Sequence, residues 1–390
     1  MKIVIFAETY YPDVMGGGEF STKQMAEGLA ERGHEVVVYC LGTEVAKEDI
    51  RGVCVKRKYL KGLSEHFMSL CRNTTVADPF TRLSKISRKW GDLYPDRKWY
   101  ETYRSLITKE KPDLVHTAAP MSYLGRANLW RAAYDLKIPV SHVARGPLLL
   151  EIGFLGGRLD AWNKKRNAKA SSCLTALAAP SSYMLNAHLK AGIKGRRFND
   201  VIYNSAGPVP EEITEDFIKQ KENMILYAGE ISSKKGISTL CDAVAGLDGL
   251  RTVLIGSGPL AEDIRREGRA EVLGWMEQED LFSYMKKAKA VVLPSVWNEP
   301  FGRILTEAVN CGTIAIGSDR GGIPEVLAHD EDYIFKSGDL AGLRHRIKRV
   351  TELTSSGYME EIEKQRSFSC NYTDEAYKEK WEKFFLQQLG

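Results

Sequence analysis

The sequence predicts an α/β protein made of two doubly wound, Rossmann-like domains, each with a parallel sheet between layers of helices. Three observations support this fold class. The chain has 390 residues, which is more than one hydrophobic core usually organises. Short apolar strands alternate with helical segments in both halves of the chain, as they do in α/β proteins. A connection between Val201 and Glu222, with two prolines and several acidic residues, separates the halves.

The first half begins with a continuous apolar run from Lys2 to Ala7, which predicts a buried strand. A glycine-containing loop follows, and then helical spacing from Glu19 to Arg32 that ends at Gly33. A strand, a helix and a further strand make a βαβ unit, which implies parallel pairing. The further strands expected in this half are 35–40, 113–116, 139–144 and 173–179.

The second half repeats the pattern, with strands expected at 224–228, 252–255, 290–293 and 313–316. We therefore place one domain at residues 1–205 and the other at residues 206–373, facing each other across a cleft. Open parallel sheets bind ligands beyond the carboxyl ends of their strands. The ligand sites of both domains are therefore expected to face this cleft.

A last helix is expected at residues 374–390, where Thr373 and Asp374 supply a cap. Aromatic residues recur along it at helical spacing, and they are Tyr377, Trp381, Phe384 and Phe385. This apolar face has to pack on a domain. From the residues alone, its own domain and the amino-terminal domain are equal alternatives.

Composition favours a soluble globular enzyme. Hydrophobic residues make up 43% of the chain and charged residues 27%. No apolar run approaches the roughly 20 residues that a membrane-spanning helix needs. The seven cysteines are scattered without metal-ligand spacing, which favours reduced thiols and a cytoplasmic location.

Basic and aromatic residues are interleaved between Arg51 and Lys111, and a second basic run from Lys164 to Lys169 follows Trp162. Such a surface can simply be a solvated helix face, or it can contact an anionic acceptor or the inner face of a membrane. Nucleic acid is the least favoured partner, because no nucleic-acid-binding motif accompanies the charge.

The segment between Glu299 and Glu307 carries the most specific chemistry. Pro300 suits the first turn of a helix. Free backbone N–H groups at such a helix start attract phosphate, and here they would belong to Phe301, Gly302, Arg303 and Ile304. Two carboxylates with a phosphate site between them suit a ligand that has hydroxyl groups at both ends and a diphosphate in the middle. A nucleotide sugar has this form.

Other candidate residues follow predicted strands. Lys235 comes after strand 224–228, where its charge can neutralise a leaving diphosphate. Gly16 and Gly17 precede the first helix and either let backbone amides approach a phosphate or form a tight turn. His116 and Arg145 lie at strand ends and should face the cleft, as candidates on the acceptor side. Arg145 would contact the transferred sugar or an anionic acceptor, or else form a structural ion pair.

In order and spacing, these motifs resemble the GT-B glycosyltransferases, and among them the retaining family four (glycosyl transferases group 1). The resemblance covers nearly the whole chain and is strongest from Tyr227 to Leu327. It implies that Glu299 contacts the donor sugar and Glu307 the ribose hydroxyls. It also implies that the last helix crosses back onto the amino-terminal domain.

The resemblance extends the expected donor site to glycine-containing turns. Gly16 and Gly17 would close over the donor phosphates from the amino-terminal domain. Gly258, in Gly-Ser-Gly-Pro, and Trp275, after a glycine, match further family motifs, and the latter lies where main-chain groups hold the base. Glu230 is a departure, because the family usually has an arginine there. We expect that Lys234 or Arg303 supplies the missing positive charge.

The resemblance implies an enzyme of the hexosyltransferase type that moves a sugar from a nucleotide diphosphate sugar to an acceptor hydroxyl with retention. We expect the acceptor to be a lipid-linked or cell-surface glycan precursor, as in polysaccharide or lipopolysaccharide synthesis. The candidate catalytic residues are Glu299, Lys235 and Arg145. No Asp-x-Asp motif lies in a fitting place, so neither a metal nor another cofactor is expected. A nucleotide-sugar 2-epimerase and a non-catalytic nucleotide-sugar-binding protein are the alternatives.

Overall fold

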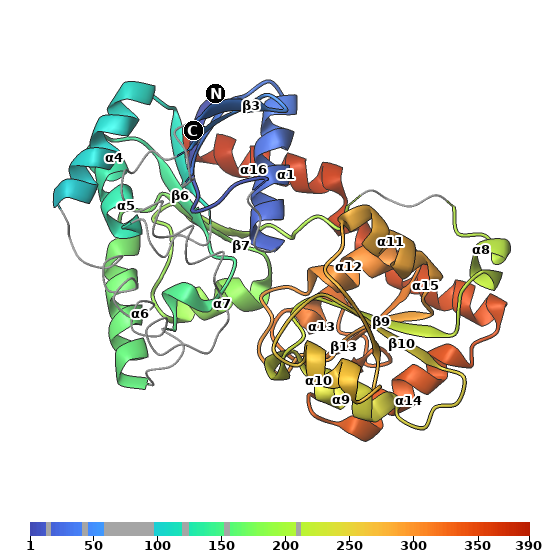
Figure 1. Ribbon diagram of the computed structural model, residues 1–390. Helices are drawn as coiled ribbons and strands as arrows, with labels where there is room; N and C mark the ends of the chain where they lie inside the picture. Colours follow the sequence, from blue (N-terminus) through green and yellow to red (C-terminus); the bar gives the residue numbers. More distant parts are fainter. Residues whose placement is uncertain (13–16, 41–45, 58–96, 119–124, 152–156, 208–211) are drawn as a thin grey trace. The chain divides into compact units, whose positions relative to one another are not determined.

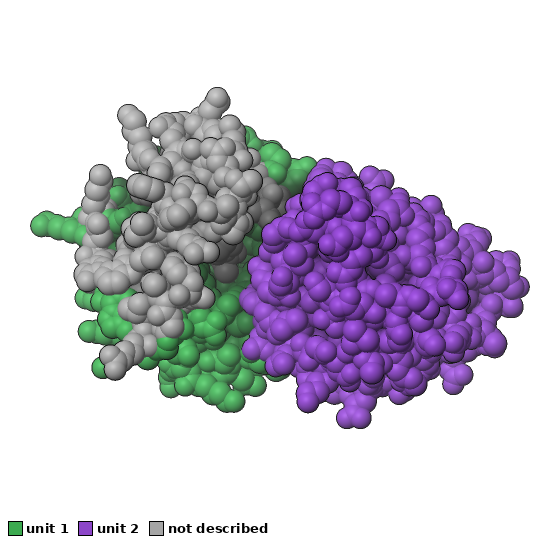
Figure 2. Space-filling model, turned by 60° about the horizontal axis from the view of Figure 1, so that its bottom comes forward, with its two compact units in different colours: residues 1–202, 378–390 green, residues 203–377 purple. Residues whose placement is uncertain are grey.

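The computed structural model describes residues 1–12, 17–40, 46–57, 97–118, 125–151, 157–207 and 212–390 (Figure 1). These residues form two compact units, coloured separately in Figure 2. Unit 1 comprises residues 1–202 and 378–390, and unit 2 comprises residues 203–377. Each unit has its own sheet with helices on both faces. The predicted fold class is therefore confirmed.

The sheet of unit 1 has the strand order β3-β4-β2-β1-β5-β6-β7-β8, in which only the β3–β4 pair is antiparallel among the strands described. Its strands are β1 (Lys2–Phe6), β2 (Glu35–Cys40), β3 (Lys47–Ile50), β4 (Val53–Arg57), β5 (Leu114–Thr117), β6 (Val140–Val143), β7 (Ala176–Ala179) and β8 (Phe198–Val201). All five predicted strands of this half are present. The prediction missed β3, β4 and β8, whose residues are only partly buried and lack a continuous apolar run.

Helices cover both faces of this sheet. One face carries α1 (Gly17–Glu31) together with α16 (Asp374–Leu389), which comes from the other end of the chain (Figure 1). The opposite face carries α4 (Arg97–Glu110) and α5 (Arg126–Asp135), which pack on each other. Among the described residues, the unit also contains α6 (Gly157–Ser171), α7 (Ser182–Lys190) and the short 3-10 turn η1 (Pro147–Leu149).

Helix α16 is an integral part of unit 1. The indole of Trp381 is fully buried and packs edge-on against the ring of His116 in β5, at a centroid distance of 5.2 Å. Phe384 packs in the same way on Phe198 in β8. At the rim, Glu382 accepts hydrogen bonds from Arg32 and bonds the ring of His34. The expectation that the last helix crosses back to the amino-terminal domain is confirmed.

The sheet of unit 2 is parallel throughout, in the order β11-β10-β9-β12-β13-β14. Its strands are β9 (Met224–Ala228), β10 (Arg251–Ile255), β11 (Glu271–Gly274), β12 (Ala290–Leu293), β13 (Ile314–Ser318) and β14 (Ile334–Phe335). The strand order reverses between β9 and β12. Such a reversal is the point at which loops leave the sheet in opposite directions and a ligand crevice can form.

The helices of unit 2 lie in two layers (Figure 1). One layer contains α9 (Ile237–Val244), α10 (Ala261–Arg266) and α14 (Leu340–Thr351). The other contains α11 (Gln278–Lys287), α12 (Arg303–Asn310) and α15 (Ser355–Ser369). Shorter elements are α8 (Glu215–Lys219), α13 (Ile323–Val326), η2 (Ser233–Lys235) and η3 (Cys370–Tyr372). Helix α8 lies within the predicted connection 201–222, which is therefore partly helical, with Thr214 as its N-cap.

Among the described helices, none is both long and apolar enough to span a bilayer.

We predict that Trp381→Ala lowers the free energy of unfolding by about 3–5 kcal/mol, because it removes a fully buried aromatic side chain between α16 and β5. The measurement is urea unfolding followed by circular dichroism. Leu386→Ala is the matched control, since this leucine lies on the same helix but is 49% exposed; it should change stability by less than about 0.5 kcal/mol. Equal effects of the two substitutions would contradict the packing described for α16.

Candidate functional site

A cluster of charged side chains lies at the carboxyl ends of β9 and β12, where the strand order of unit 2 reverses. Lys235 follows β9, and Glu299 follows β12. The Lys235 ammonium donates to Glu299 Oε1 at 2.6 Å. Sequence alone predicted both residues, and the topology of the sheet brings them together.

The loops after β9 and β12 are joined through their backbones. The carbonyl oxygen of Lys234 accepts hydrogen bonds from the N–H groups of Val296 and Trp297. Gly236 has a φ of +71°, and a Cβ atom there would lie 1.9 Å from the carbonyl oxygen of Pro294. Only glycine fits this close approach. The two loops therefore form one structural unit beneath the charged side chains.

The Glu299 carboxylate is held by three donors. Its Oε1 atom accepts hydrogen bonds from Lys235 Nζ at 2.6 Å, Ser295 Oγ at 2.5 Å and Trp297 Nε1 at 2.8 Å. Its side chain is only 8% exposed. Within the described residues Oε2 has no hydrogen-bond partner. One oxygen of this carboxylate thus has a structural role, and the other is left to accept from a ligand.

The main chain of Glu299 is fixed as well. Its carbonyl oxygen accepts a hydrogen bond of 2.8 Å from Gly322 N–H, just before α13. Gly321 has a φ of +64°, and a Cβ there would lie 2.2 Å from the same oxygen. Backbone contacts therefore hold the segment that carries Glu299 from both sides.

The helix expected to start at Pro300 begins later. Gly302 is the N-cap, with a φ of +106°, and α12 starts at Arg303. Glu299 therefore lies in a loop, and only Glu307 lies on the helix. The Phe301 side chain is buried and stacks on Tyr203. Of the four residues expected at the helix start, only Arg303 and Ile304 are in its first turn.

Glu307 is paired along α12. Its Oε1 atom accepts a hydrogen bond of 2.7 Å from Arg303 Nε, one turn earlier, and its side chain is only 8% exposed. Burial raises the pKa of the Glu307 carboxyl, and the Arg303 guanidinium opposes this shift in part. A carboxylate this deep needs a donor, and Arg303 supplies one in the structure.

Glu230 is paired with Lys234. Their charged groups lie 2.7 Å apart, and both side chains are about half exposed. The Tyr227 hydroxyl donates to the Glu230 carbonyl at 2.8 Å, which fixes the backbone where the chain leaves β9. Glu230 thus neighbours the lysines of the cluster, and each of the cations Lys234, Lys235 and Arg303 has a carboxylate partner.

The glycine turn after β10 packs under the loop that follows β9. A Cβ at Gly258 would lie 2.3 Å from the carbonyl oxygen of Ile231. Ile231 N–H in turn donates to the carbonyl of Ser257. Gly258 is therefore required by loop packing. Trp275 follows β11 and is 70% exposed, and β11 is separated from β9 by β10.

In unit 1 the expected phosphate loop is described only in part. Gly16 lies outside the described residues, and Gly17 is the first residue of α1. Glu19, in the first turn of α1, is buried and accepts a hydrogen bond of 3.2 Å from the Thr9 hydroxyl. Most of the basic and aromatic residues between 51 and 111 also lie outside the described residues.

The expectation that His116 faces a ligand is wrong. It pairs in register with Ile5 on the face of the sheet that α16 covers, and its ring is fully buried against Trp381 and Phe385. Nδ1 is bonded to the Ser141 hydroxyl at 2.9 Å. Desolvation, and then the nearby Arg145 charge, hold the pKa of His116 well below its usual value. Arg145 follows β6 and is half-buried. His142 is a buried core residue, with Nδ1 at 2.8 Å from the Thr117 hydroxyl.

Ser295 and Trp297 were not among the predicted site residues. Both lie between the end of β12 and Glu299, and their contacts with Oε1 depend on how this loop folds back. Their position just before the predicted acid was the only signal available in the sequence.

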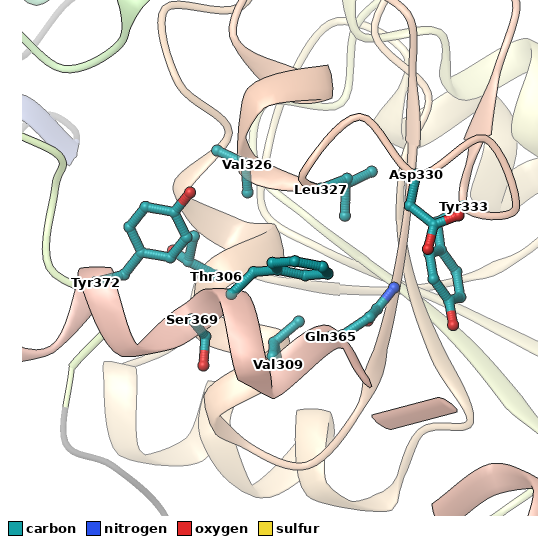
Figure 3. Close-up of a pocket in the computed structure, with 10 residues that line it drawn as sticks. Thr306, Val309, Val326, Leu327, Asp330, Tyr333, Gln365, Ser369 and Tyr372 are labelled. Carbon is teal, nitrogen blue, oxygen red and sulfur yellow. The ribbon is translucent and has the colours of Figure 1, made fainter. Parts of the chain in front are cut away.

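A small pocket behind α12 is a packing gap, and none of the charged residues of the cluster lines it. Figure 3 shows Thr306 and Val309 of α12 facing Val326, Leu327 and Tyr372 across it. Its polar residue Gln365 already donates to and accepts from the main chain of Ala315. In the part of the chain that the structure describes, no group of three or more potential ligands could hold a metal ion.

Comparisons with known proteins place both units in one class. The model of Glycosyltransferase Family 4 matches residues 15–205, and the model of Glycosyl transferases group 1 matches residues 209–368. A Klebsiella pneumoniae protein, known as an uncharacterized 42.6 kDa protein in the cps region, is 26% identical over 84% of this chain and 87% of its own.

Solved structures share the fold at low identity. Sucrose-phosphate synthase from Thermosynechococcus elongatus superimposes with a TM-score of 0.71 at 20% identity, over 99% of this chain and 98% of that one. Anabaena HepE in complex with UDP-glucose gives a TM-score of 0.67 at 17% identity, over 99% of this chain and 100% of that one.

We predict that His116→Gln makes the folded protein less sensitive to acid. Below pH 6.5 the unfolded chain binds a proton at His116 that the folded chain does not bind, because the pKa of the buried ring is lowered. Stability therefore falls as the pH falls, by up to about 1.4 kcal/mol per pH unit for this one group.

The measurement is the free energy of unfolding in urea between pH 7 and pH 5. The variant should lose up to this much of the slope, whatever its stability at pH 7. His345→Gln, at an exposed position of α14, is the control and should keep the wild-type slope. An unchanged slope in His116→Gln would show that the ring is not buried in its neutral form.

Proposed function

Because the chain belongs to the group 1 glycosyltransferases of the GT-B fold, we propose that it transfers a sugar, with retention, from a nucleoside diphosphate sugar to an acceptor hydroxyl. One observation carries this proposal. Glu299 has Oε1 occupied by three protein donors and leaves Oε2 for a ligand, at the strand-order reversal of unit 2. A fixed carboxylate beside a lysine suits a sugar hydroxyl next to a phosphate.

On this proposal the donor binds to unit 2. Glu299 Oε2 accepts from a hydroxyl of the transferred sugar, and Lys235 contacts the diphosphate. The first turn of α12, from Arg303, offers its positive end to the same phosphates. Glu307 would accept from the ribose hydroxyls, and Trp275 would lie near the base. UDP-glucose is the ligand in the HepE structure, which supports a nucleoside diphosphate sugar as the donor.

The proposed reaction takes place on one face of the sugar. The bond from the anomeric carbon to the diphosphate oxygen breaks, and a bond to the acceptor oxygen forms on the same face. The acceptor proton passes to the departing diphosphate. The protein contributes positioning and charge stabilisation, for which Lys235 and Glu299 are the candidate catalytic residues in unit 2. Arg145 remains the candidate in unit 1, toward the sugar or an anionic acceptor.

We propose that transfer needs no metal ion, because Lys235, Lys234 and the start of α12 can contact the diphosphate directly once a lysine exchanges its carboxylate partner for a phosphate oxygen. EDTA should then leave the rate unchanged. Loss of activity in EDTA, restored by Mg²⁺ or Mn²⁺, would contradict this part of the proposal.

We propose a lipid-linked or other anionic glycan precursor as the acceptor. Helix α6 carries Lys165 and Lys169 on its exposed surface, and Arg166 lies over the Trp162 ring at 4.7 Å. Basic residues beside an aromatic ring suit an anionic lipid surface. The name of the Klebsiella relative, a protein of a cps region, is consistent with a role in glycan synthesis.

The first experiment identifies the donor. Each of a panel of UDP, GDP, ADP and dTDP sugars is tested for its effect on Tm, since only a bound ligand stabilises the folded state by mass action. The stabilising donor is then incubated with and without a lipid-linked acceptor. Acceptor-dependent release of nucleoside diphosphate supports transfer. Epimerised donor without release supports a 2-epimerase, and binding without chemistry supports a binding protein.

We predict that Glu299→Gln lowers kcat by about 100-fold or more, because the amide is a weaker acceptor for a charge-developing sugar. Affinity for the free nucleoside diphosphate, which lacks the sugar, should not fall, because the substitution also releases Lys235 from its carboxylate partner. The control is Glu279→Gln, at an exposed position of α11, which should leave both quantities unchanged. A parallel loss of kcat and diphosphate affinity would show that Glu299 acts on the phosphates instead.

We predict that Glu230→Gln tightens binding of the nucleoside diphosphate by roughly two- to fivefold, the scale of an exposed ion pair. The substitution removes a negative charge near the phosphates and releases Lys234 from its partner 2.7 Å away. Lys234→Ala should weaken binding by a similar factor. Isothermal titration at low and high salt measures both effects. If Glu230→Gln weakens binding, Glu230 itself contacts the ligand.

A further inference from the structure

We propose that Trp297 is a positioning residue of the donor site, which orients Glu299 and Lys235 together so that Oε2 and the ammonium face the same ligand. This inference rests on the proposed function of the cluster. It concerns a residue that takes no part in the chemistry itself. Three contacts of the Trp297 side chain and one of its main chain support it.

The indole lies against three of the charged groups around the reversal point. Its N–H donates to Glu299 Oε1 at 2.8 Å. The ring centroid lies 5.1 Å from Lys235 Nζ and 5.7 Å from Lys234 Nζ, both within cation–π range. Its main-chain N–H donates to the carbonyl of Lys234 at 3.2 Å. One side chain therefore links the loop after β12 to the loop after β9.

The number of donors at Glu299 Oε1 explains why the indole hydrogen bond matters for the orientation of the sugar. A carboxylate oxygen offers about two lone-pair positions, and here it faces three donors. An incoming sugar hydroxyl therefore cannot compete for Oε1 and is directed to Oε2. If the indole donor were lost, Oε1 would keep only Ser295 once Lys235 turns to the phosphates, and a position would be open there. The hydroxyl could then bind either oxygen. The sugar would then be held in more than one orientation.

The other two donors cannot replace this function. Ser295 is fully buried just after β12. Its carbonyl accepts hydrogen bonds from the hydroxyls of Ser318 and Ser337, which fix it to the neighbouring elements of the sheet. On the proposed function, the Lys235 ammonium also contacts the donor diphosphate. Trp297 is half-buried, uncharged, and supplies both an N–H and an aromatic face. Phenylalanine would keep the face without the N–H, and leucine would keep neither.

The test separates these two contributions. Trp297→Phe should lower kcat by roughly 10- to 100-fold, the scale of one hydrogen bond to a charged group, with UDP affinity within about twofold of wild type. Trp297→Leu should lower kcat at least as much and also weaken UDP binding, because both lysines lose the ring. Val296→Ala, at the neighbouring exposed side chain, is the control and should match wild type in Tm, kcat and UDP affinity.

A double-mutant cycle shows whether Trp297 acts through Glu299. In a Glu299→Gln background, Trp297→Phe should cause no further loss of kcat, because the carboxylate that it orients is gone. Full additivity of the two losses would overturn the proposal, as would a Trp297→Phe enzyme with wild-type kcat. A loss of kcat that only parallels a fall in Tm would reduce Trp297 to a structural residue and would also overturn it.

A measurement without turnover keeps this inference separate from the proposed function. In a spectrum of the ¹⁵N-labelled indole groups, the Trp297 signal is identified by its absence in Trp297→Phe. Glu299→Gln should shift that signal upfield and speed its exchange with water, because the bond to a charged oxygen becomes a weaker one. If the protein turns over no nucleotide sugar but the signal shifts, the proposed function fails and the positioning contact stands. An unmoved signal overturns the positioning contact.

Discussion

The bond between Lys235 and Glu299 Oε1 is the interaction on which the rest of unit 2 depends. It joins side chains from two loops that leave adjacent strands, β9 and β12, at the reversal of the strand order. The loops can come this close only because Gly236 accepts a backbone conformation and a contact that a Cβ would prevent. Buried charge of this kind is costly unless every member has a partner, and the neighbouring donors on Oε1 meet that requirement.

Much of this arrangement could be predicted from the sequence because strands buried on both faces leave continuous apolar runs. Those runs placed Lys235 directly after a strand, whereas the pairing of β9 with β12, which brings Glu299 beside it, is known only from the structure. The start of α12 was misplaced because Pro300 is compatible with a first turn, whereas the φ of +106° at Gly302 depends on its surroundings. His116 was misjudged for a different reason. Its position near a strand end suggested exposure, but its face of the sheet is covered by a helix from the far end of the chain.

The contacts of Ser295 and Trp297 could not be predicted, because they depend on the path of a loop and not on any periodicity. The same holds for the partner of Glu230. The sequence suggested that Lys234 or Arg303 supplies the charge of the missing arginine, but not that Lys234 lies 2.7 Å from the Glu230 carboxylate itself. Three cations and three carboxylates form three pairs in this region. A dianionic ligand therefore enters a region whose charges are already balanced, and it has to exchange one of these pairs for its own contacts.

The chain order of unit 1 has a consequence for biosynthesis. Residues 378–390 belong to unit 1 although the whole of unit 2 precedes them. During translation, β1 to β8 are complete long before Trp381 and Phe385 leave the ribosome, so the face of β5 that carries His116 lacks its cover throughout the synthesis of unit 2. Unit 2 is a continuous segment and can fold around its own core, whereas unit 1 is complete only after residues 378–390 have been made. A nascent chain of this protein therefore exposes apolar surface on unit 1 until α16 has been made, and chaperones that recognise such surface can bind it in that interval.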